Sequence, residues 1–320
     1  MVFLRAEEGK QALFPREYAR VFSEKKYLYG VSMGEEKMTL SQWRKEFVAS
    51  LSGLYPPEEA QALFFRSVEH ALGIGRLRYA MEKDRELPGE DSGRLRRIED
   101  ELLTGRPLQY ITGEQVFCGR SFSVDARALI PRGETEELVD RVLRENAGQP
   151  ARVLDVGTGS GAIAVSLALE RPAWKVEALD VSPDALALAR ENARRLGAEV
   201  AFRQADILQE DAWAALGTYD LVVSNPPYVR ECEREQMHDN VRRYEPPLAL
   251  FVPDEDPLRF YRAIGRFAFA GLTAGGRLYF EINRAFGRQT AALLAGLGFG
   301  AVEVFQDING CDRMVRAVKK

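Results

Sequence analysis

The chain runs Val153-Leu154-Asp155-Val156-Gly157-Thr158-Gly159-Ser160-Gly161 near its midpoint, an apolar run followed by alternating glycines. The apolar run predicts a buried strand, and the glycines predict a loop that leads into a helix. Glycine permits positive φ and close approach of a ligand to the backbone, and a helix N-terminus offers free N–H groups. The stretch therefore predicts that some polar ligand binds at the end of a strand.

Strands and helices alternate from this stretch to the C-terminus. We predict strands at 152–156, 175–180, 200–203, 220–224 and 276–282, and helices at 161–170, 183–196 and 257–270. Two final strands, 302–306 and 314–318, share the short connection Asp307-Ile308-Asn309-Gly310, which forces them antiparallel. The alternation predicts an α/β fold with a mostly parallel sheet, helices on both faces and an antiparallel last strand.

The first third of the chain is predicted to be a small helical domain. Thr39 and Gln42 fit a capping box before apolar residues at helical spacing, and Pro56-Pro57-Glu58-Glu59 opens a further helix. A short hairpin is predicted where Gly119 separates two apolar segments. We therefore divide the chain into an extension at 1–37, a helical domain at 38–112, a hairpin linker at 113–131 and an α/β domain at 132–320.

Composition and charge exclude several classes of protein. The chain has 320 residues, with a hydrophobic fraction of 46% and a charged fraction of 29%, typical of a soluble globular protein. A net charge of −4 argues against a protein whose main role is to bind the nucleic-acid backbone. No apolar run reaches the roughly 18 residues that a membrane span needs. Three cysteines without a C-x-x-C pair and only two histidines argue against zinc or His-triad chemistry. We expect a cytoplasmic protein without a metal ion.

Three acidic residues surround the predicted loop. Asp155 precedes the loop, Asp180 ends the next strand about 20 residues further on, where an acid reaches ribose hydroxyls in this architecture, and Asp206 is predicted to close the following strand. The glycine spacing is G-x-G-x-G rather than the dinucleotide pattern G-x-G-x-x-G. Three acids would repel a pyrophosphate but suit a sulfonium, an ammonium and ribose hydroxyls. The charges therefore favour S-adenosylmethionine over NAD.

A second motif follows the apolar run at 221–223 and reads Ser224-Asn225-Pro226-Pro227-Tyr228. Each proline lacks an N–H and fixes its own φ, so the strand must end there. An amide, a rigidly held carbonyl and an aromatic ring are thereby presented at the carboxyl end of a strand, where open α/β sheets bind ligands. Taken alone, the motif is equally consistent with a stiff turn after a strand.

Motifs from both domains resemble those of one enzyme family. The glycine loop after Asp155, Asp180 and the motif at 225–228 are similar to class I S-adenosylmethionine-dependent methyltransferases that modify planar nitrogens. The closer resemblance, from about Thr39 to the C-terminus, is to the bacterial peptide chain release factor glutamine methyltransferases. It rests further on Gly105-Arg106-Pro107-Leu108-Gln109-Tyr110-Ile111-Thr112-Gly113, Ile130-Pro131-Arg132-Gly133-Glu134-Thr135-Glu136 and Tyr244-Glu245-Pro246-Pro247-Leu248-Ala249-Leu250. The positions that depart from the family's usual residues are Gly133, Ile207 and Asn283.

The resemblance implies a fold, a reaction and a partner. The α/β domain is expected to be a Rossmann-like class I methyltransferase sheet. The enzyme is expected to methylate the amide nitrogen (N5) of the glutamine in the Gly-Gly-Gln motif of class I release factors, converting S-adenosylmethionine to S-adenosylhomocysteine. The helical domain is expected to recognise the release factor. We expect the protein to be a monomer that binds no membrane and makes no direct contact with nucleic acid.

The resemblance also implies site residues. The expected cofactor site comprises Gly157, Thr158, Gly159, Ser160, Gly161, Asp180, Ile207 and Asn225, to which the charge argument adds Asp206. The expected substrate site comprises Asn225, Pro226, Pro227 and Tyr228, with Asn225, Pro226 and Tyr228 as its catalytic members. The Asn225 side-chain oxygen and the Pro226 carbonyl can each accept an N–H of a glutamine amide, whose delocalised lone pair makes it a poor nucleophile, and Tyr228 can pack on the flat amide. No general base is required.

Two other functions remain open at this point. An adenine or guanine methyltransferase acting on nucleic acid could hold a flipped base with the same motif, because an exocyclic amine is equally planar. The acidic net charge and the lack of a separate basic domain count against it. A binding protein that uses the cofactor only to order itself is disfavoured by the coexistence of the loop, the acids and the motif at 225–228.

Overall fold

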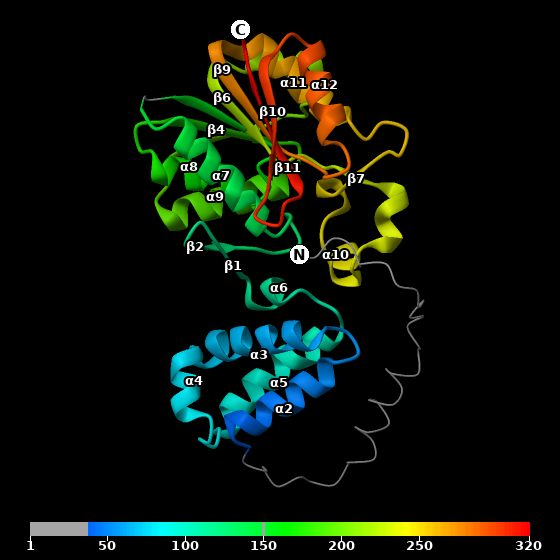
Figure 1. Cartoon of the computed structure of the whole chain (residues 1–320). Coiled ribbons are helices and arrows are strands. Elements are labelled where there is room, and N and C mark those ends of the chain that lie inside the picture. Colours follow the sequence, from blue (N-terminus) through cyan, green and yellow to red (C-terminus); the bar gives the residue numbers. More distant parts are fainter. Residues whose placement is uncertain (1–37, 149–150) are drawn as a thin grey trace. The chain divides into compact units, whose positions relative to one another are not determined.

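The computed structural model describes residues 38–148 and 151–320. The expected extension at 1–37 lies outside the described residues. The described residues form two compact units, which divide between Thr112 and Gly113 (Figure 1). Across the described residues, no helix combines the length and the apolar character needed to span a bilayer.

The first unit consists of helices around one apolar core. These helices are α2 (Leu40–Leu51), α3 (Pro57–Leu72), α4 (Arg76–Glu82), α5 (Gly89–Leu103) and α6 (Leu108–Thr112). The predicted capping box is present, since Thr39 Oγ1 accepts the Gln42 N–H and the Gln42 side chain accepts the Thr39 N–H at 2.7 Å. Trp43, Phe47 and Phe64 are buried in the shared core. The helical character expected for this part of the chain is confirmed.

Helix α4 is an element that the sequence pattern does not predict. Its one buried side chain is Tyr79, while Leu77 and Met81 are 78% and 73% exposed. A helix with a single buried side chain lacks the repeating apolar stripe by which amphipathic helices are recognised.

The second unit contains a seven-stranded sheet in the order β10-β11-β9-β6-β3-β4-β5. In chain order its strands are β3 (Arg152–Val156), β4 (Lys175–Asp180), β5 (Val200–Gln204), β6 (Tyr219–Ser224), β9 (Leu272–Glu281), β10 (Gly300–Gln306) and β11 (Asp312–Val318). Strands β5, β4, β3, β6 and β9 are paired in parallel, and β11 is antiparallel to both of its neighbours. The predicted mostly parallel sheet with an antiparallel last strand is confirmed. That strand lies between β9 and β10, a position that periodicity does not specify.

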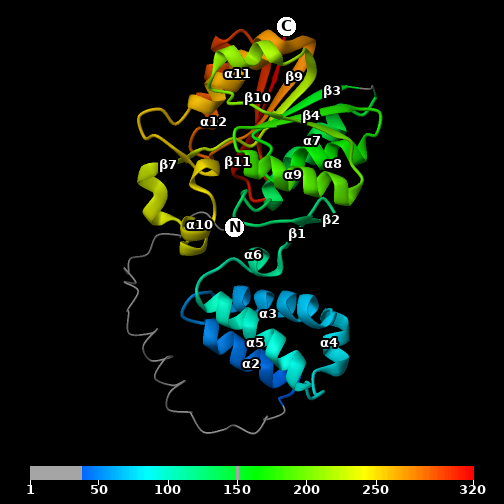
Figure 2. The same cartoon turned by 180° about the vertical axis from the view of Figure 1, so that it is seen from behind.

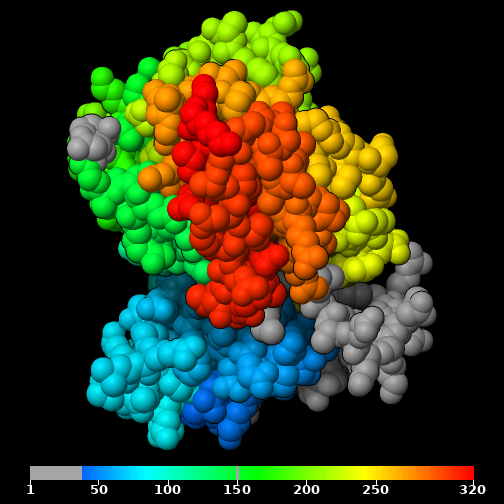
Figure 3. All heavy atoms as spheres, turned by 45° about the horizontal axis from the view of Figure 1, so that its top comes forward, coloured from blue at the N-terminus to red at the C-terminus, as the bar shows by residue number. Residues whose placement is uncertain are grey.

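Helices cover both faces of this sheet (Figures 1 and 2). One face carries α7 (Gly133–Glu145), α8 (Ala162–Glu170) and α9 (Pro183–Leu196), and the other carries α11 (Arg259–Gly271) and α12 (Gly287–Gly296). Because successive side chains of a strand point to opposite faces, Val153 packs in the core with α8 and Leu154 in the core with α11. Figure 3 shows the C-terminal elements, in orange and red, at the surface of this unit.

The predicted hairpin precedes the sheet and belongs to the second unit. Strand β1 (Glu114–Phe117) pairs antiparallel with β2 (Arg120–Ser123). Its turn residues, Cys118 and Gly119, both have positive φ, of 47° and 72°. Two successive residues with positive φ form the turn that matches the twist of a two-stranded hairpin.

An insertion at 229–252 separates β6 from α11. It holds β7 (Val229–Arg230), the 3₁₀ helix η2 (Glu231–Gln236), α10 (Asp239–Tyr244), the 3₁₀ helix η3 (Pro247–Ala249) and β8 (Phe251–Val252). Strands β7 and β8 pair in parallel. The insertion was not predicted, because strands of two residues and single helical turns are too short to show a periodic pattern.

Candidate active site

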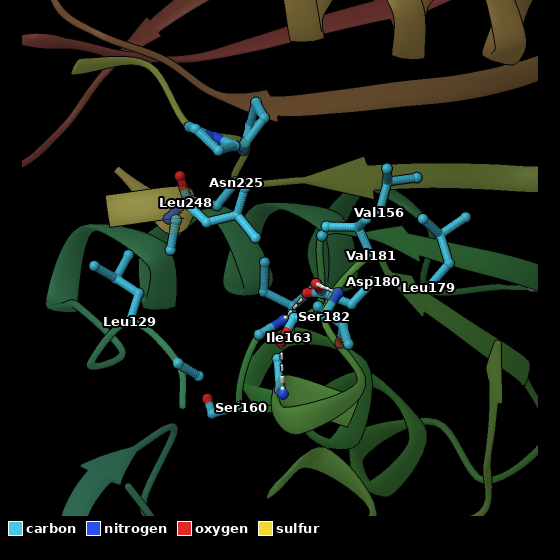
Figure 4. A pocket seen from close by; sticks show the side chains of 18 of the residues that line it. Leu129, Val156, Ser160, Ile163, Leu179, Asp180, Val181, Ser182, Asn225 and Leu248 are labelled. Atoms are coloured by element: carbon cyan, nitrogen blue, oxygen red, sulfur yellow. Dashed lines mark hydrogen bonds between the residues drawn. The ribbon is translucent and has the colours of Figure 1, made fainter. Parts of the chain in front are cut away.

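A cavity opens at the carboxyl ends of β3, β4 and β6 in the second unit (Figure 4). It leaves about 1100 Å³ unfilled by protein atoms, part of it open to solvent. Its walls come from the segment before α7, the glycine loop, the ends of β4 and β5, the motif after β6 and the insertion at 229–252. Open α/β sheets bind ligands at this edge, where the strand order reverses.

The glycine loop is attached to β4 and packs on α9. Gly157, Gly159 and Gly161 have φ of 73°, 54° and 83°, in the left-handed region that favours glycine. The Gly157 N–H donates to the Leu179 carbonyl at 2.9 Å. A Cβ on Gly161 would lie 3.1 Å from the Cβ of Ala189. The loop therefore requires glycine for its backbone and, at Gly161, for close packing as well.

Asp155 lies beneath the loop and is not among the residues that line the cavity. Its Oδ2 accepts the Thr158 hydroxyl at 2.6 Å and the Ala164 N–H at 3.2 Å, and its side chain is fully buried. Burial raises the pKa of Asp155 to about 7. Of the three acids around the loop, Asp155 supplies no carboxylate to the cavity wall, because its carboxylate binds the first turn of α8 instead.

Asp180 lines the cavity at the end of β4 (Figure 4). Its Oδ2 accepts the Gly159 N–H at 2.8 Å, and its Oδ1 accepts the Ser182 N–H at 2.9 Å. Burial raises the pKa of Asp180, and these backbone donors oppose that rise. One carboxylate thus holds the glycine loop and the start of α9 in a fixed relation to each other.

Asp206 and Ile207 enter the cavity wall from the loop after β5. The prediction that Asp206 closes this strand is wrong, because β5 ends at Gln204. The Asp206 carboxylate accepts the N–H of Leu208, two positions further along the chain, at 2.9 Å. Ile207 is 6% exposed and supplies branched apolar surface to the wall.

Two arginines also line the cavity, and carboxylates bind both of them. Arg127 pairs with Asp125 and Glu191, and Arg132 pairs with Glu245. Their charge is therefore balanced by residues other than the two acids of the cavity wall. In the described part of the chain, no three His, Cys, Asp or Glu side chains are grouped so that they could hold a metal ion.

The motif after β6 supplies three lining residues, Asn225, Pro226 and Pro227. Ser224, the last residue of β6, donates its hydroxyl to the Val156 carbonyl at 2.6 Å. This bond ties the end of β6 to the strand that carries the glycine loop. The two motifs singled out in the sequence therefore meet at one cavity.

Thr135 and Glu281 connect Asn225 with Tyr228, and sequence reasoning assigned neither of them a role. The Asn225 Nδ2 donates to Thr135 Oγ1 at 3.2 Å, and Thr135 Oγ1 donates to Glu281 Oε2 at 2.6 Å. The Tyr228 hydroxyl donates to Glu281 Oε1 at 3.1 Å. Glu281 is 1% exposed, and burial raises its pKa. An acid at the carboxyl end of an apolar strand is the signal that could have identified it.

Tyr228 is not among the residues that line the cavity. It packs against the core on the α11 face of the sheet, and burial raises the pKa of its hydroxyl well above the ordinary value. Its backbone carbonyl accepts the Asn283 Nδ2 at 3.2 Å. The packing of Tyr228 against a substrate amide stays a prediction.

Glu245 joins two walls of the cavity. It is 3% exposed, accepts the Ile130 N–H at 3.0 Å and forms an ion pair with Arg132. The neighbours Pro131 and Pro246 both line the cavity. The insertion at 229–252 is thus held against the segment before α7 by one buried carboxylate.

These features define a class of protein. Residues 116–242 match the family described as "Methyltransferase small domain", and residues 42–113 match the family described as "PrmC N-terminal domain". A solved methyltransferase from Pyrococcus furiosus is 18% identical, with a TM-score of 0.48, covering 71% of this chain and 98% of its own. The second unit is a Rossmann-like methyltransferase domain, with the glycine loop and cavity at the carboxyl edge of its sheet.

Curated relatives narrow this class to one family. A release factor glutamine methyltransferase from Bacteroides thetaiotaomicron is 46% identical over 268 residues, which are 84% of this chain and 96% of its own. Proteins of the same name from Flavobacterium psychrophilum and Enterococcus faecalis are 39% and 37% identical, covering 87% and 89% of this chain and 99% and 100% of their own. The chain belongs to the release factor glutamine methyltransferase family and is an enzyme.

Proposed function

We propose that this enzyme methylates the amide nitrogen (N5) of the glutamine in the Gly-Gly-Gln motif of class I release factors. S-adenosylmethionine is the proposed donor, and S-adenosylhomocysteine the product. The observation that carries the proposal is the orientation of Asn225, whose Nδ2 donates to Thr135 while nothing in residues 38–148 and 151–320 donates to its Oδ1. A carbonyl oxygen presented in this way can accept an N–H of a substrate amide.

The cavity residues fit S-adenosylmethionine. Asp180 and Asp206 supply carboxylates for ribose hydroxyls and for the ammonium and sulfonium charges, while the lining arginines already have carboxylate partners. The positive-φ glycines let the backbone of 157–161 approach the ligand. Ile207 offers an apolar surface to the adenine. We assign cofactor binding to these residues together with Asn225.

The residues after β6 orient the substrate amide. Bound S-adenosylmethionine supplies an electrophilic methyl group on a sulfonium. The Asn225 oxygen and the Pro226 carbonyl each accept one N–H of the glutamine amide, which aims its delocalised lone pair at the methyl carbon, and the ring of Pro227 restricts the backbone that carries this carbonyl. As the new N–C bond forms, the nitrogen becomes acidic and one proton leaves to water. No side chain has to act as a base.

We assign recognition of the release factor body to the helical domain at 38–112. A Gly-Gly-Gln tip is too small to account for selectivity by itself. The match of residues 42–113 to a family of N-terminal domains supports a function for this unit distinct from methyl transfer. We propose that the enzyme acts as a cytoplasmic monomer without direct contact to nucleic acid.

One labelling experiment tests the substrate. The full chain is incubated with methyl-labelled S-adenosylmethionine and, separately, a class I release factor, the same factor with its tip glutamine changed to alanine, and duplex DNA. Label is expected on the intact factor alone. Label on the alanine variant would place the reaction at another residue, and label on DNA alone would replace the proposed function by the nucleic-acid alternative.

A further inference from the structure

We propose that Glu281 is a positioning residue of the methyl-transfer site: acting through Thr135, it determines which end of the Asn225 amide faces the substrate. The inference rests on the proposed function, in which the Asn225 oxygen accepts a substrate N–H. Glu281 reaches Asn225 only through Thr135. It therefore acts on the orientation of a neighbour and not on the reacting atoms.

Strand register brings the three side chains together. Strands β6 and β9 are parallel neighbours in which Ser224 is paired with Phe280. Asn225 and Glu281 follow at the next position of each chain, at the carboxyl edge of the sheet. Thr135 lies in the first turn of α7, and its hydroxyl stands between them.

The donors and acceptors allow only one direction for the hydrogen bonds that link Asn225, Thr135 and Glu281. An ionised carboxylate only accepts hydrogen bonds, so the 2.6 Å contact from Thr135 Oγ1 to Glu281 uses the single hydroxyl proton of Thr135. Thr135 then presents lone pairs to Asn225 and accepts its Nδ2 at 3.2 Å. The two ends of a carboxamide have nearly the same shape, so packing does not choose between them. As the acceptor of the Thr135 hydroxyl, Glu281 therefore directs the Asn225 oxygen away from Thr135.

The second oxygen of Glu281 is also held. Its Oε1 accepts the Tyr228 hydroxyl at 3.1 Å. Burial raises the pKa of Glu281, while the hydrogen bonds from Thr135 and Tyr228 and the charge of Arg313 oppose that rise. Both oxygens thus receive donors, as a group that only accepts requires.

The isosteric variant Glu281→Gln tests this polarity. A glutamine amide can donate to Thr135, which releases the hydroxyl proton toward Asn225 and lets the Asn225 amide turn over. We expect kcat for release factor methylation to fall on the order of 10- to 100-fold, with cofactor affinity unchanged. Thr135→Val should lose a similar factor, and Thr135→Ser, which keeps the hydroxyl, should retain activity. Because both residues act through one chain, the double variant Glu281→Gln/Thr135→Val should lose no more than either single variant.

Asp220→Asn is the matched control. Asp220 lies at the other end of the same strand pair, where its Oδ1 accepts the Thr273 hydroxyl at 3.0 Å and its Oδ2 accepts the Arg152 N–H at 2.8 Å. This variant should leave kcat unchanged. Three results would overturn the inference: wild-type kcat in Glu281→Gln, additive losses in the double variant, or an equal loss in Asp220→Asn.

A readout without turnover separates this inference from the proposed function. The Asn225 side-chain NH₂ signals, identified by their absence in Asn225→Asp, should exchange hydrogen slowly in the wild type and faster in Glu281→Gln and Thr135→Val. If the wild type failed to methylate release factors but its exchange were slower than that of the two variants, the proposed function would be refuted and the inference about the hydrogen-bond chain would be supported. Equal exchange in all three proteins would overturn the inference even in an active enzyme.

Discussion

Glu245 and Ile130 are joined by a 3.0 Å hydrogen bond from the buried Ile130 N–H to the Glu245 carboxylate, although 115 positions separate them in sequence. The same carboxylate forms an ion pair with Arg132. One side chain therefore holds two walls of the cavity together, the segment before α7 and the insertion at 229–252.

Glu245→Ala should loosen the insertion. In this variant the Ile130 N–H stays buried without its acceptor, and Arg132 loses a carboxylate partner. Removing one partner of a buried ion pair destabilises the folded protein by about 3 kcal/mol. Thermal unfolding should show this loss, and limited proteolysis should show faster cleavage within 229–252. The control Glu255→Ala, at an exposed position of the following loop, should change stability by less than about 0.5 kcal/mol. Equal behaviour of the two variants would contradict the prediction.

Asn225→Ala should remove most turnover. Loss of one oriented acceptor should slow the single-turnover rate about 100-fold. Cofactor affinity should fall less, because Asp180 and the glycine loop remain. Rapid-quench experiments with labelled donor measure the rate, and calorimetry measures the affinity. Asn309→Ala, exposed in the turn between β10 and β11, serves as the control, and an unchanged single-turnover rate in Asn225→Ala would show that this residue does not orient the substrate.

Asp180→Ala should act mainly on the cofactor. The variant loses the carboxylate that holds the Gly159 and Ser182 N–H groups and that is proposed to bind the ribose. Hydrogen bonds to a charged group contribute about 1.5–3 kcal/mol, so affinity should fall about 10- to 100-fold. Calorimetric titration with S-adenosylmethionine measures it. Asp184→Ala, at an exposed position in the first turn of α9, should bind like the wild type, and wild-type affinity in Asp180→Ala would refute the assignment.

Gly161→Ala should destabilise the fold more than Gly197→Ala. Both glycines have positive φ, 83° and 75°, so an alanine at either position is strained by about 1 kcal/mol. At Gly161 the new Cβ would also lie 3.1 Å from the Ala189 Cβ, whereas nothing lies within 4 Å at Gly197. Overpacking should add a further loss of about 1–3 kcal/mol, measured by denaturant unfolding. Equal losses of stability in the two variants would mean that α9 shifts to accommodate the new Cβ without a further loss of stability.

Asp155→Asn should change the pH dependence of stability. Asp155 has a pKa of about 7 in the folded protein against an ordinary value of 3.8, so between these values the folded state holds a proton that the unfolded state has lost. The contribution of Asp155 to the free energy of unfolding therefore falls as the pH rises from 3.8 to about 7, and it stays level above pH 7. The variant lacks this titration, and its Tm relative to the wild type should rise with pH across the same window. A difference in Tm that is independent of pH would contradict the raised pKa.

Much of the secondary structure could be predicted because its causes are local. The capping box of Thr39 and Gln42 and the positive-φ turn at Gly119 depend on residues within a few positions of one another. Strand β9 was predicted to begin at 276 but begins at Leu272, since Gly275 and Gly276 interrupt its apolar pattern at the point where its pairing with β6 shifts register. The insertion at 229–252 was missed because its elements, six residues long at most, are too short to repeat a periodic pattern.

The candidate site could be predicted in part. Asp180 and the motif at 225–227 line the same cavity as the glycine loop, because the carboxyl ends of neighbouring parallel strands meet at one edge. Asp155 belongs to the same motif as the loop, yet its carboxylate turns under the loop to α8. The contact between Thr135 and Glu281 joins residues 146 positions apart, and no local pattern encodes it.

By itself, the sequence determined the alternation of strands and helices, the glycine loop, the proline-terminated strand and the resemblance to one methyltransferase family. These follow from backbone conformation and from spacing along the chain. Only the tertiary structure decided that Asp155 is buried, that Glu245 joins two walls of the cavity and that Thr135 connects Glu281 with Asn225. Burial and hydrogen-bond polarity depend on which groups the order of the sheet brings together, and that order is established only when distant strands pair.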